Sequence, residues 1–135
     1  MAYFEWSDEL SVNIKKIDEQ HHRLVEMINE LYEGMKSKQA NDILSKILTG
    51  MVEYAKTHFA TEETYMATYK FPGLAEHKAE HAIFSAKAVD MLARYKINPA
   101  YLTAETGLFL KRWLSDHIQG TDKLYAPFLN DKGIY

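Results

Sequence analysis

The sequence predicts an all-α protein, an antiparallel up-down-up-down four-helix bundle with an N-terminal arm. Apolar residues recur at helical spacing in four long stretches, and no stretch alternates apolar and polar residues for long, as a strand would. The breaks between the stretches, Asn41-Asp42, Phe71-Pro72-Gly73 and Asn98-Pro99, are short. Because short turns join antiparallel neighbours, the four helices are expected to pack around one core.

Each stretch places its apolar residues on one face, with three- and four-residue spacing. Asp18 is the expected N-cap of the first helix, and Pro72 suits a position near the start of the third. The inward faces are His21, Leu24, Val25, Ile28, Leu31, Tyr32 and Met35 in the first stretch; Leu44, Ile47, Leu48, Met51, Ala55, His58, Glu62 and Tyr65 in the second; Leu74, His77, His81, Phe84, Ala88, Met91 and Tyr95 in the third; and Leu102, Thr106, Phe109, Leu110, Trp113 and His117 in the fourth.

The ends of the chain lie outside these four stretches. Before the first helix there is enough apolar surface for an arm that lies against the bundle, carried by Phe4, Trp6, Leu10, Val12 and Ile14. After Gly120 only a short tail is expected.

Composition indicates one globular domain over residues 1–135, with 47% hydrophobic and 26% charged residues. A net charge of −3 and the lack of a basic cluster give no reason to expect nucleic acid as a partner. Without cysteine, thiolate metal sites and disulfides are excluded. The apolar runs are too short for membrane insertion, and the first residues do not resemble a signal peptide, so we expect a cytoplasmic protein.

Polar side chains interrupt the inward apolar faces. His58 and Glu62 are four residues apart, as are His77 and His81. A four-residue step turns a helix by about 400°, so both members of each pair project from one face. A buried polar side chain costs roughly 2–7 kcal/mol unless it is satisfied, and in a bundle such side chains on facing helices can bind metal.

A single histidine in an apolar face is more often a hydrogen-bonded core residue than a ligand. Here every helix carries at least one, so a shared metal site explains the pattern better than five separate core histidines. Asp122 lies five residues after His117, about 140° away on an ideal helix, and reaches the same site only if the helix loosens or ends between them, which Gly120 permits. His22 points away from His21 and is expected on the surface.

The complete pattern resembles the hemerythrin family in its bacterial single-domain form. The resemblance covers nearly the whole chain, and the spacing of all seven side chains is specific to the family. The segments that carry it are Trp6-Ser7, Ile17-Asp18-Glu19-Gln20-His21, His58-Phe59-Ala60-Thr61-Glu62-Glu63, His77-Lys78-Ala79-Glu80-His81 and Trp113-Leu114-Ser115-Asp116-His117, followed by Asp122.

The resemblance implies two non-haem iron ions per chain, bridged by an oxo or hydroxo group, and reversible binding of molecular oxygen for storage, transport or delivery. It implies one iron on His77, His81 and His117, the other on His21 and His58, and carboxylate bridges from Glu62 and Asp122. These ligands and the bridging oxygen fill all but about one of the roughly 12 positions of two octahedral irons. The open position lies on the iron with two histidines.

In similar proteins an apolar pocket covers the open position. The matching residues here are Phe59, Trp113, Leu114 and Ile118, which would exclude water and anions that promote oxidation of the iron. The same four residues can also be interpreted as ordinary core packing. For Phe59 and Trp113, the pocket and the packing interpretations can both be true.

Several alternatives stay open at this point. A di-iron enzyme or sensor acting on oxygen, peroxide or nitric oxide is the second function, but the chain lacks the glutamate-rich Glu-x-x-His ligand pairs of di-iron oxidases, and five neutral imidazoles suit reversible binding better than catalysis. A sensor would need a separate output protein. A structural zinc needs about four ligands, not seven. If the chain delivers oxygen, an oxygen-consuming protein would receive it, and the sequence does not identify that partner.

Overall fold

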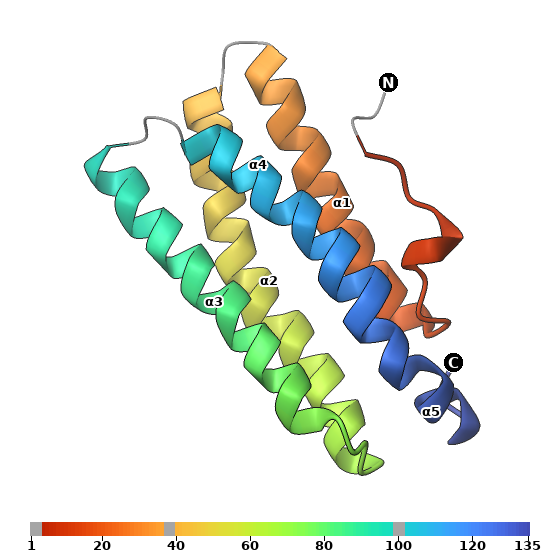
Figure 1. Ribbon diagram of the computed structural model, residues 1–135. Coiled ribbons are helices and arrows are strands. Elements are labelled where there is room, and N and C mark those ends of the chain that lie inside the picture. Colours follow the sequence, from red (N-terminus) through yellow and green to blue (C-terminus); the bar gives the residue numbers. More distant parts are fainter. Residues whose placement is uncertain (1–3, 37–39, 99–101) are drawn as a thin grey trace.

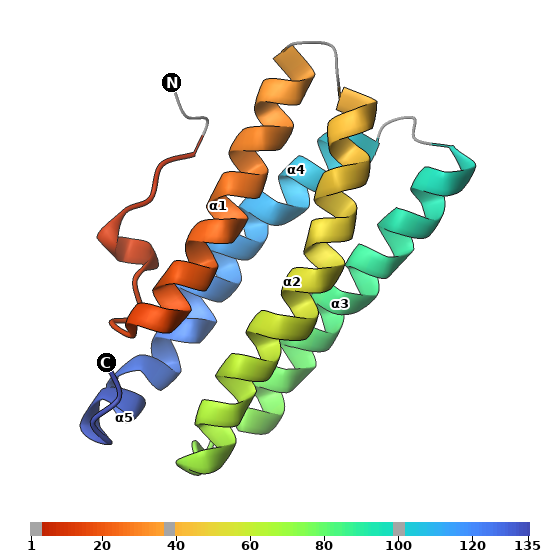
Figure 2. The same cartoon turned by 180° about the vertical axis from the view of Figure 1, so that it is seen from behind.

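The fold is an antiparallel bundle of four long helices, as predicted. The structure is a computed structural model that describes residues 4–36, 40–98 and 102–135. The helices are α1 (Lys15–Lys36), α2 (Ala40–Thr68), α3 (Leu74–Ile97) and α4 (Leu102–Arg112). They lie side by side, and consecutive helices run in opposite directions (Figures 1 and 2). Within the described ranges there is no strand.

The break before α2 lies slightly earlier than predicted, since Asn41 and Asp42 are already helical. Pro99 falls outside the described residues. Most residues of the inward faces are buried as expected, such as Leu24, Leu48 and Met91 at 0% exposure, and the others are half-buried. Met35 is the exception at 45% exposure, because it lies at the rim of a groove between α1 and α4.

The chain after α4 is more ordered than the short tail that the sequence suggested. It continues without a break as a π-helix, η2 (Trp113–Thr121), then a 3₁₀ turn, η3 (Asp122–Leu124), and a last helix, α5 (Tyr125–Asp131). The prediction was wrong because three apolar residues of this region, Tyr125, Ala126 and Leu129, are buried. They form a second core cluster with Ile17 and Met66, which closes one end of the bundle.

The N-terminal arm lies against the bundle, as predicted. It contains a short 3₁₀ turn, η1 (Asp8–Leu10), and buries Leu10 and Val12. The backbone of Phe4 exchanges two hydrogen bonds with the Asn29 side chain of α1, its N–H donating at 2.8 Å and its carbonyl accepting at 2.9 Å. Figure 1 shows the arm running beside α1.

Asp18 does not cap α1, because the helix begins at Lys15, three residues earlier. Its carboxylate instead reaches back to the arm, where it accepts hydrogen bonds from the Ser11 hydroxyl at 2.6 Å and from the Val12 N–H at 2.8 Å. Asp18 therefore fixes the arm to the first turn of α1, beside the residues that enter the second core cluster.

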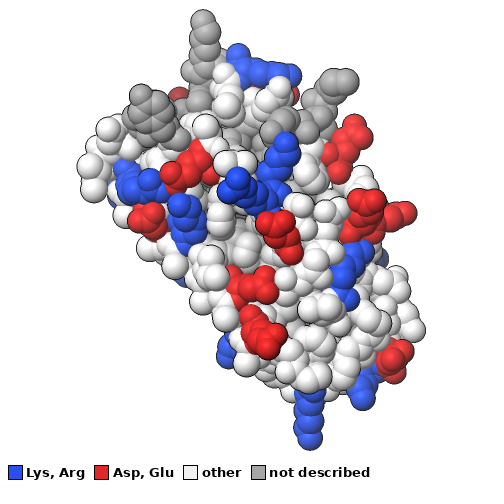
Figure 3. All heavy atoms as spheres, viewed as in Figure 1, with Lys and Arg blue, Asp and Glu red and all other residues white. Residues whose placement is uncertain are grey.

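On the face seen in Figure 3, Lys and Arg are interspersed with Asp and Glu. Among the described helices, none has the length and apolar character needed to cross a bilayer.

Helices α1 and α2 approach closely at Gly34. A Cβ added to Gly34 would lie 2.9 Å from the Cβ of Ile43, an atom that cannot move without the backbone, whereas one added to Gly107 meets nothing closer than 3.7 Å. We expect Gly34→Ala to be less stable than Gly107→Ala by about 1–3 kcal/mol, the usual cost of overpacking. Chemical denaturation of both variants measures this. Equal stabilities would show that the α1–α2 contact has room for a methyl group.

Candidate metal centre

The seven predicted ligands meet in the interior of the bundle. They come from α1, α2, α3 and the segment that continues α4, and each is at most 2% exposed. The set is His21 of α1, His58 and Glu62 of α2, His77 and His81 of α3, His117 of η2 and Asp122 of η3.

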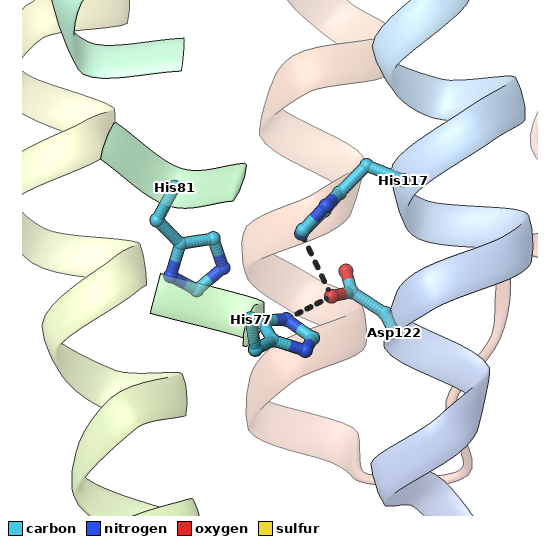
Figure 4. Close-up of side chains that lie close together, drawn as sticks. All are labelled: His77, His81, His117 and Asp122. Carbon is cyan, nitrogen blue, oxygen red and sulfur yellow. Dashed lines mark ion pairs between the residues drawn. The ribbon is translucent and has the colours of Figure 1, made fainter. Parts of the chain in front are cut away.

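These side chains form two groups whose potential ligand atoms lie within 4.8 Å of one another. One group contains His77, His81, His117 and Asp122, and Figure 4 shows them pointing toward one another from α3 and from the end of the chain. The other contains His21, His58 and Glu62. The division matches the two sets of histidines that the family resemblance assigns to two irons.

Asp122 joins the first group because the helix that carries His117 is a π-helix. The Asp122 N–H donates to the His117 carbonyl, a five-residue step in place of the four-residue step of an α-helix. Residues five apart then project from nearly the same side, and His117 Nε2 lies 3.0 Å from Asp122 Oδ1. The predicted loosening is present. Gly120 lies within the π-helix, its backbone is not left-handed, and an added Cβ would have open space around it.

The Asp122 carboxylate spans the two groups. Its Oδ1 lies 2.7 Å from His77 Nε2 and 3.0 Å from His117 Nε2 (Figure 4). Its Oδ2 lies 3.1 Å from His21 Nε2. Glu62 is placed similarly: its Oε2 lies 3.5 Å from His77 Nε2, and its Oε1 contacts His58. Each carboxylate thus directs its two oxygens to different histidines.

The donor set fits metal ions. The Nε2 atoms of all five histidines and all four carboxylate oxygens are buried and, among the described residues, have no hydrogen-bond partner, although several lie within ion-pair distance of each other. The lone pairs of several of these atoms are directed at the same point, where one metal ion can accept them all. Hydrogen bonds would instead require each donor to be aligned with its own acceptor. Metal–ligand bonds of about 2.1 Å at right angles place neighbouring donor atoms about 3 Å apart, close to the distances observed.

The outward nitrogens of three histidines have partners that the sequence analysis did not identify. His58 Nδ1 bonds to Gln20 Oε1 at 2.6 Å, His81 Nδ1 to Glu63 Oε2 at 2.8 Å, and His117 Nδ1 to Glu80 Oε1 at 2.9 Å. Such bonds fix the ring orientation and the tautomer. The sequence did contain one signal for these partners: each of them directly precedes or follows a residue of the predicted centre.

Aromatic rings stack on the same three imidazoles. Phe59 lies parallel to His81 at a centroid distance of 3.9 Å, Trp113 lies 3.9 Å from His117, and Tyr54 lies 4.7 Å from His58. The predicted pocket residues Phe59 and Trp113 therefore contact the centre directly. The other two, Leu114 and Ile118, are fully buried in the same core cluster.

The two carboxylates make the centre favour positive charge. Burial would lower the pKa of His21, but the close Asp122 and Glu62 carboxylates outweigh it and raise that pKa to about 9, with the same outcome for His77. Burial and Glu62 would raise the pKa of Asp122, yet the nearby imidazoles lower it to about 2. Without metal, protons on His21 and His77 balance the two carboxylates, so metal cations must displace those protons.

Comparison with known proteins gives the same result. Residues 12–129 match the family model described as the hemerythrin HHE cation binding domain. The chain is 34% identical to a bacteriohemerythrin of Stenotrophomonas maltophilia, covering 93% of this chain and 81% of the relative. It is 31% identical to a bacteriohemerythrin of Methylococcus capsulatus, covering 96% and 99%, and 32% identical to a myohemerythrin of Riftia pachyptila, covering 90% of each.

Solved structures agree with the relatives. A wild-type hemerythrin crystal structure superposes with a TM-score of 0.84 at 30% identity, covering 95% of this chain and 98% of the other. A variant of a hemerythrin, L114A, gives a TM-score of 0.85 at the same identity, covering 96% and 98%. The chain belongs to the hemerythrin family, whose members bind oxygen reversibly at a non-haem di-iron centre, and it does the same.

Proposed function

We propose that the seven buried side chains hold the two irons in the arrangement that the sequence suggested. The placement of Asp122 supports this most directly, because one oxygen faces His77 and His117 while the other faces His21. A carboxylate in that position joins two metals. The proposed ligands are His77, His81 and His117 for one iron, His21 and His58 for the other, and Glu62 and Asp122 for both.

The irons, when bound, supply the electrons for reversible oxygen binding, and the chain controls what reaches them. With five imidazoles, two bridging carboxylates and a bridging oxygen, about one of the roughly 12 positions of two octahedral irons would stay open, on the side of His21 and His58. We propose that Phe59, Trp113, Leu114 and Ile118 form an apolar wall around the centre. An apolar wall admits oxygen but disfavours the water and anions that promote ferric iron.

We further propose that the chain is an oxygen carrier or store and not an enzyme. Five neutral imidazoles against two carboxylates make a centre less anionic than those of di-iron oxidases. Conversion of oxygen, peroxide or nitric oxide, or sensing through a partner, is the second candidate. The single domain over residues 1–135, the cytoplasmic location and an oxygen-consuming recipient protein are part of the same proposal.

Loss of a ligand should lower iron content. His58→Ala and His117→Ala each remove one imidazole from a different iron, so we expect fewer than two irons per chain after reconstitution, measured by elemental analysis. His22→Ala is the matched control, because His22 is exposed and stacks on Trp6 outside the centre. Full occupancy in both His58→Ala and His117→Ala would refute the ligand assignment.

A polar residue in the wall should speed autoxidation. Leu114→Asn or Ile118→Thr places a hydrogen-bonding group beside the centre and admits water, so we expect roughly tenfold faster conversion of the oxygenated form to the ferric form, followed by visible absorption. Leu44→Asn is the control, because Leu44 is equally buried but lies 14 residues from His58 along α2, about 21 Å away. An unchanged rate in the wall variants, or an equal rise in the control, would mean that these residues only pack the core.

Removal of the metal should destabilise the fold. Chelation leaves seven buried side chains without ligand bonds, and a ligand that binds only the folded state stabilises it by an amount that grows with the logarithm of its concentration over its dissociation constant. We expect the midpoint of thermal unfolding to fall by several degrees in the metal-free protein and to recover when iron is restored, as measured by circular dichroism. Identical midpoints would contradict a metal centre that joins α1, α2 and α3 to the segment after α4.

A further inference from the structure

The outward hydrogen bonds of the histidines differ in charge between the two halves of the centre. On the side of His58 the acceptor is the carboxamide oxygen of Gln20, which is neutral. On the other side the acceptors for His81 and His117 are the carboxylates of Glu63 and Glu80. The three bonds have nearly the same length, 2.6–2.9 Å, so they differ mainly in the charge of the acceptor.

The orientation of the Gln20 amide follows from its second bond. Its Nε2 donates to the Thr61 hydroxyl at 3.3 Å, and that hydroxyl donates its own hydrogen to the Thr57 carbonyl at 3.0 Å. The Thr61 oxygen therefore accepts, which places the amide nitrogen of Gln20 at Thr61 and its oxygen at His58. His58 must then carry its hydrogen on Nδ1, which leaves the Nε2 lone pair free to face the interior.

His21 adds to the difference. Its Nδ1 is buried and has no hydrogen-bond partner within the described part of the chain. The half of the centre that contains His21 and His58 thus has no anionic acceptor on either outward nitrogen. In the other half, Glu80 accepts from the Thr121 hydroxyl as well as from His117, which holds its carboxylate in place.

An anionic acceptor changes the imidazole as a ligand. A carboxylate draws the Nδ1 hydrogen toward itself, which increases the electron density at Nε2 and stabilises a more highly charged metal ion. A carboxamide does this more weakly, because a hydrogen bond to a neutral acceptor is weaker than one to a charged acceptor.

We propose that Gln20, Glu63 and Glu80 are positioning residues that bias the two irons differently. The carboxylates stabilise ferric iron on His81 and His117, while the neutral Gln20 leaves the iron on His21 and His58 less stabilised as ferric and so favours return to the ferrous, oxygen-free state. The inference rests on the ligand set proposed above. It assigns reversibility in part to an uncharged side chain that touches neither iron nor oxygen.

The position of Gln20 has room for a charged residue. Gln20 is partly exposed and lines an open groove of about 320 Å³ between α1 and α2, together with Tyr54 and His58. Glutamate has the same shape as glutamine, and the Thr61 hydroxyl can turn from Thr57 to donate to a carboxylate. Gln20→Glu therefore adds one charge at a fixed position with little other change.

The test compares reduction potentials of iron-loaded variants, measured by spectroelectrochemistry without oxygen. Gln20→Glu should shift the ferrous–ferric equilibrium about tenfold toward ferric, roughly 59 mV lower for a one-electron step. Glu80→Gln should shift it about tenfold the other way. Glu53→Gln is the charge-matched control, because Glu53 lines the same groove but is exposed and pairs only with Lys56 among the ion pairs of the described residues; its potential should equal that of the wild type.

Iron content separates the failure of this inference from that of the ligand set. If the wild type and the variants hold two irons per chain but their potentials do not move in opposite directions, the hydrogen bonds only hold the rings and the inference is wrong. If the wild type holds fewer than two irons, the ligand set itself fails. Should Gln20→Glu bind less iron, Glu63→Gln together with Glu80→Gln decides the matter, since both must raise the potential.

Discussion

Seven polar side chains lie inside the bundle with their ligand atoms unpaired, and the rest of the structure depends on what satisfies them. Without metal these groups have only one another, as protonated imidazoles beside carboxylates, and burying charged groups away from water costs several kcal/mol each. Two metal ions remove that cost at once. They also join α1, α2 and α3 to the segment that continues α4, because the ligands come from these four parts of the chain. The metal centre is therefore part of the core as well as the site of function.

The π-helix is the local feature that completes this arrangement. An α-helix at the same place would turn Asp122 away from His117, and the centre would lose the carboxylate that faces both histidine groups. The wider spacing also carries Tyr125 and Leu129 into the end of the bundle, where they meet Ile17 and Met66. One change in hydrogen bonding thus places a ligand and closes the second core.

The sequence was sufficient for the bundle and for the ligand candidates because both depend on spacing. His58 and Glu62, like His77 and His81, lie on one helical face wherever the helix is. The sequence was insufficient where contacts between distant parts of the chain decide the local structure. Asp18 has the residue type of an N-cap but bonds to Ser11 and Val12 of the arm, and α5 is stabilised by residues of other helices. Gln20 and Glu80 could not be recognised as partners of His58 and His117, since those contacts join residues 37 or 38 positions apart.

The most direct test of the account is the visible absorption spectrum of the iron-loaded, reduced protein, cycled between air and an inert gas. Reversible oxygen binding predicts a charge-transfer band that appears in air, disappears when oxygen is removed, and returns over repeated cycles. Irreversible oxidation in the first cycle, or no band despite two irons per chain, would contradict it and favour a di-iron enzyme.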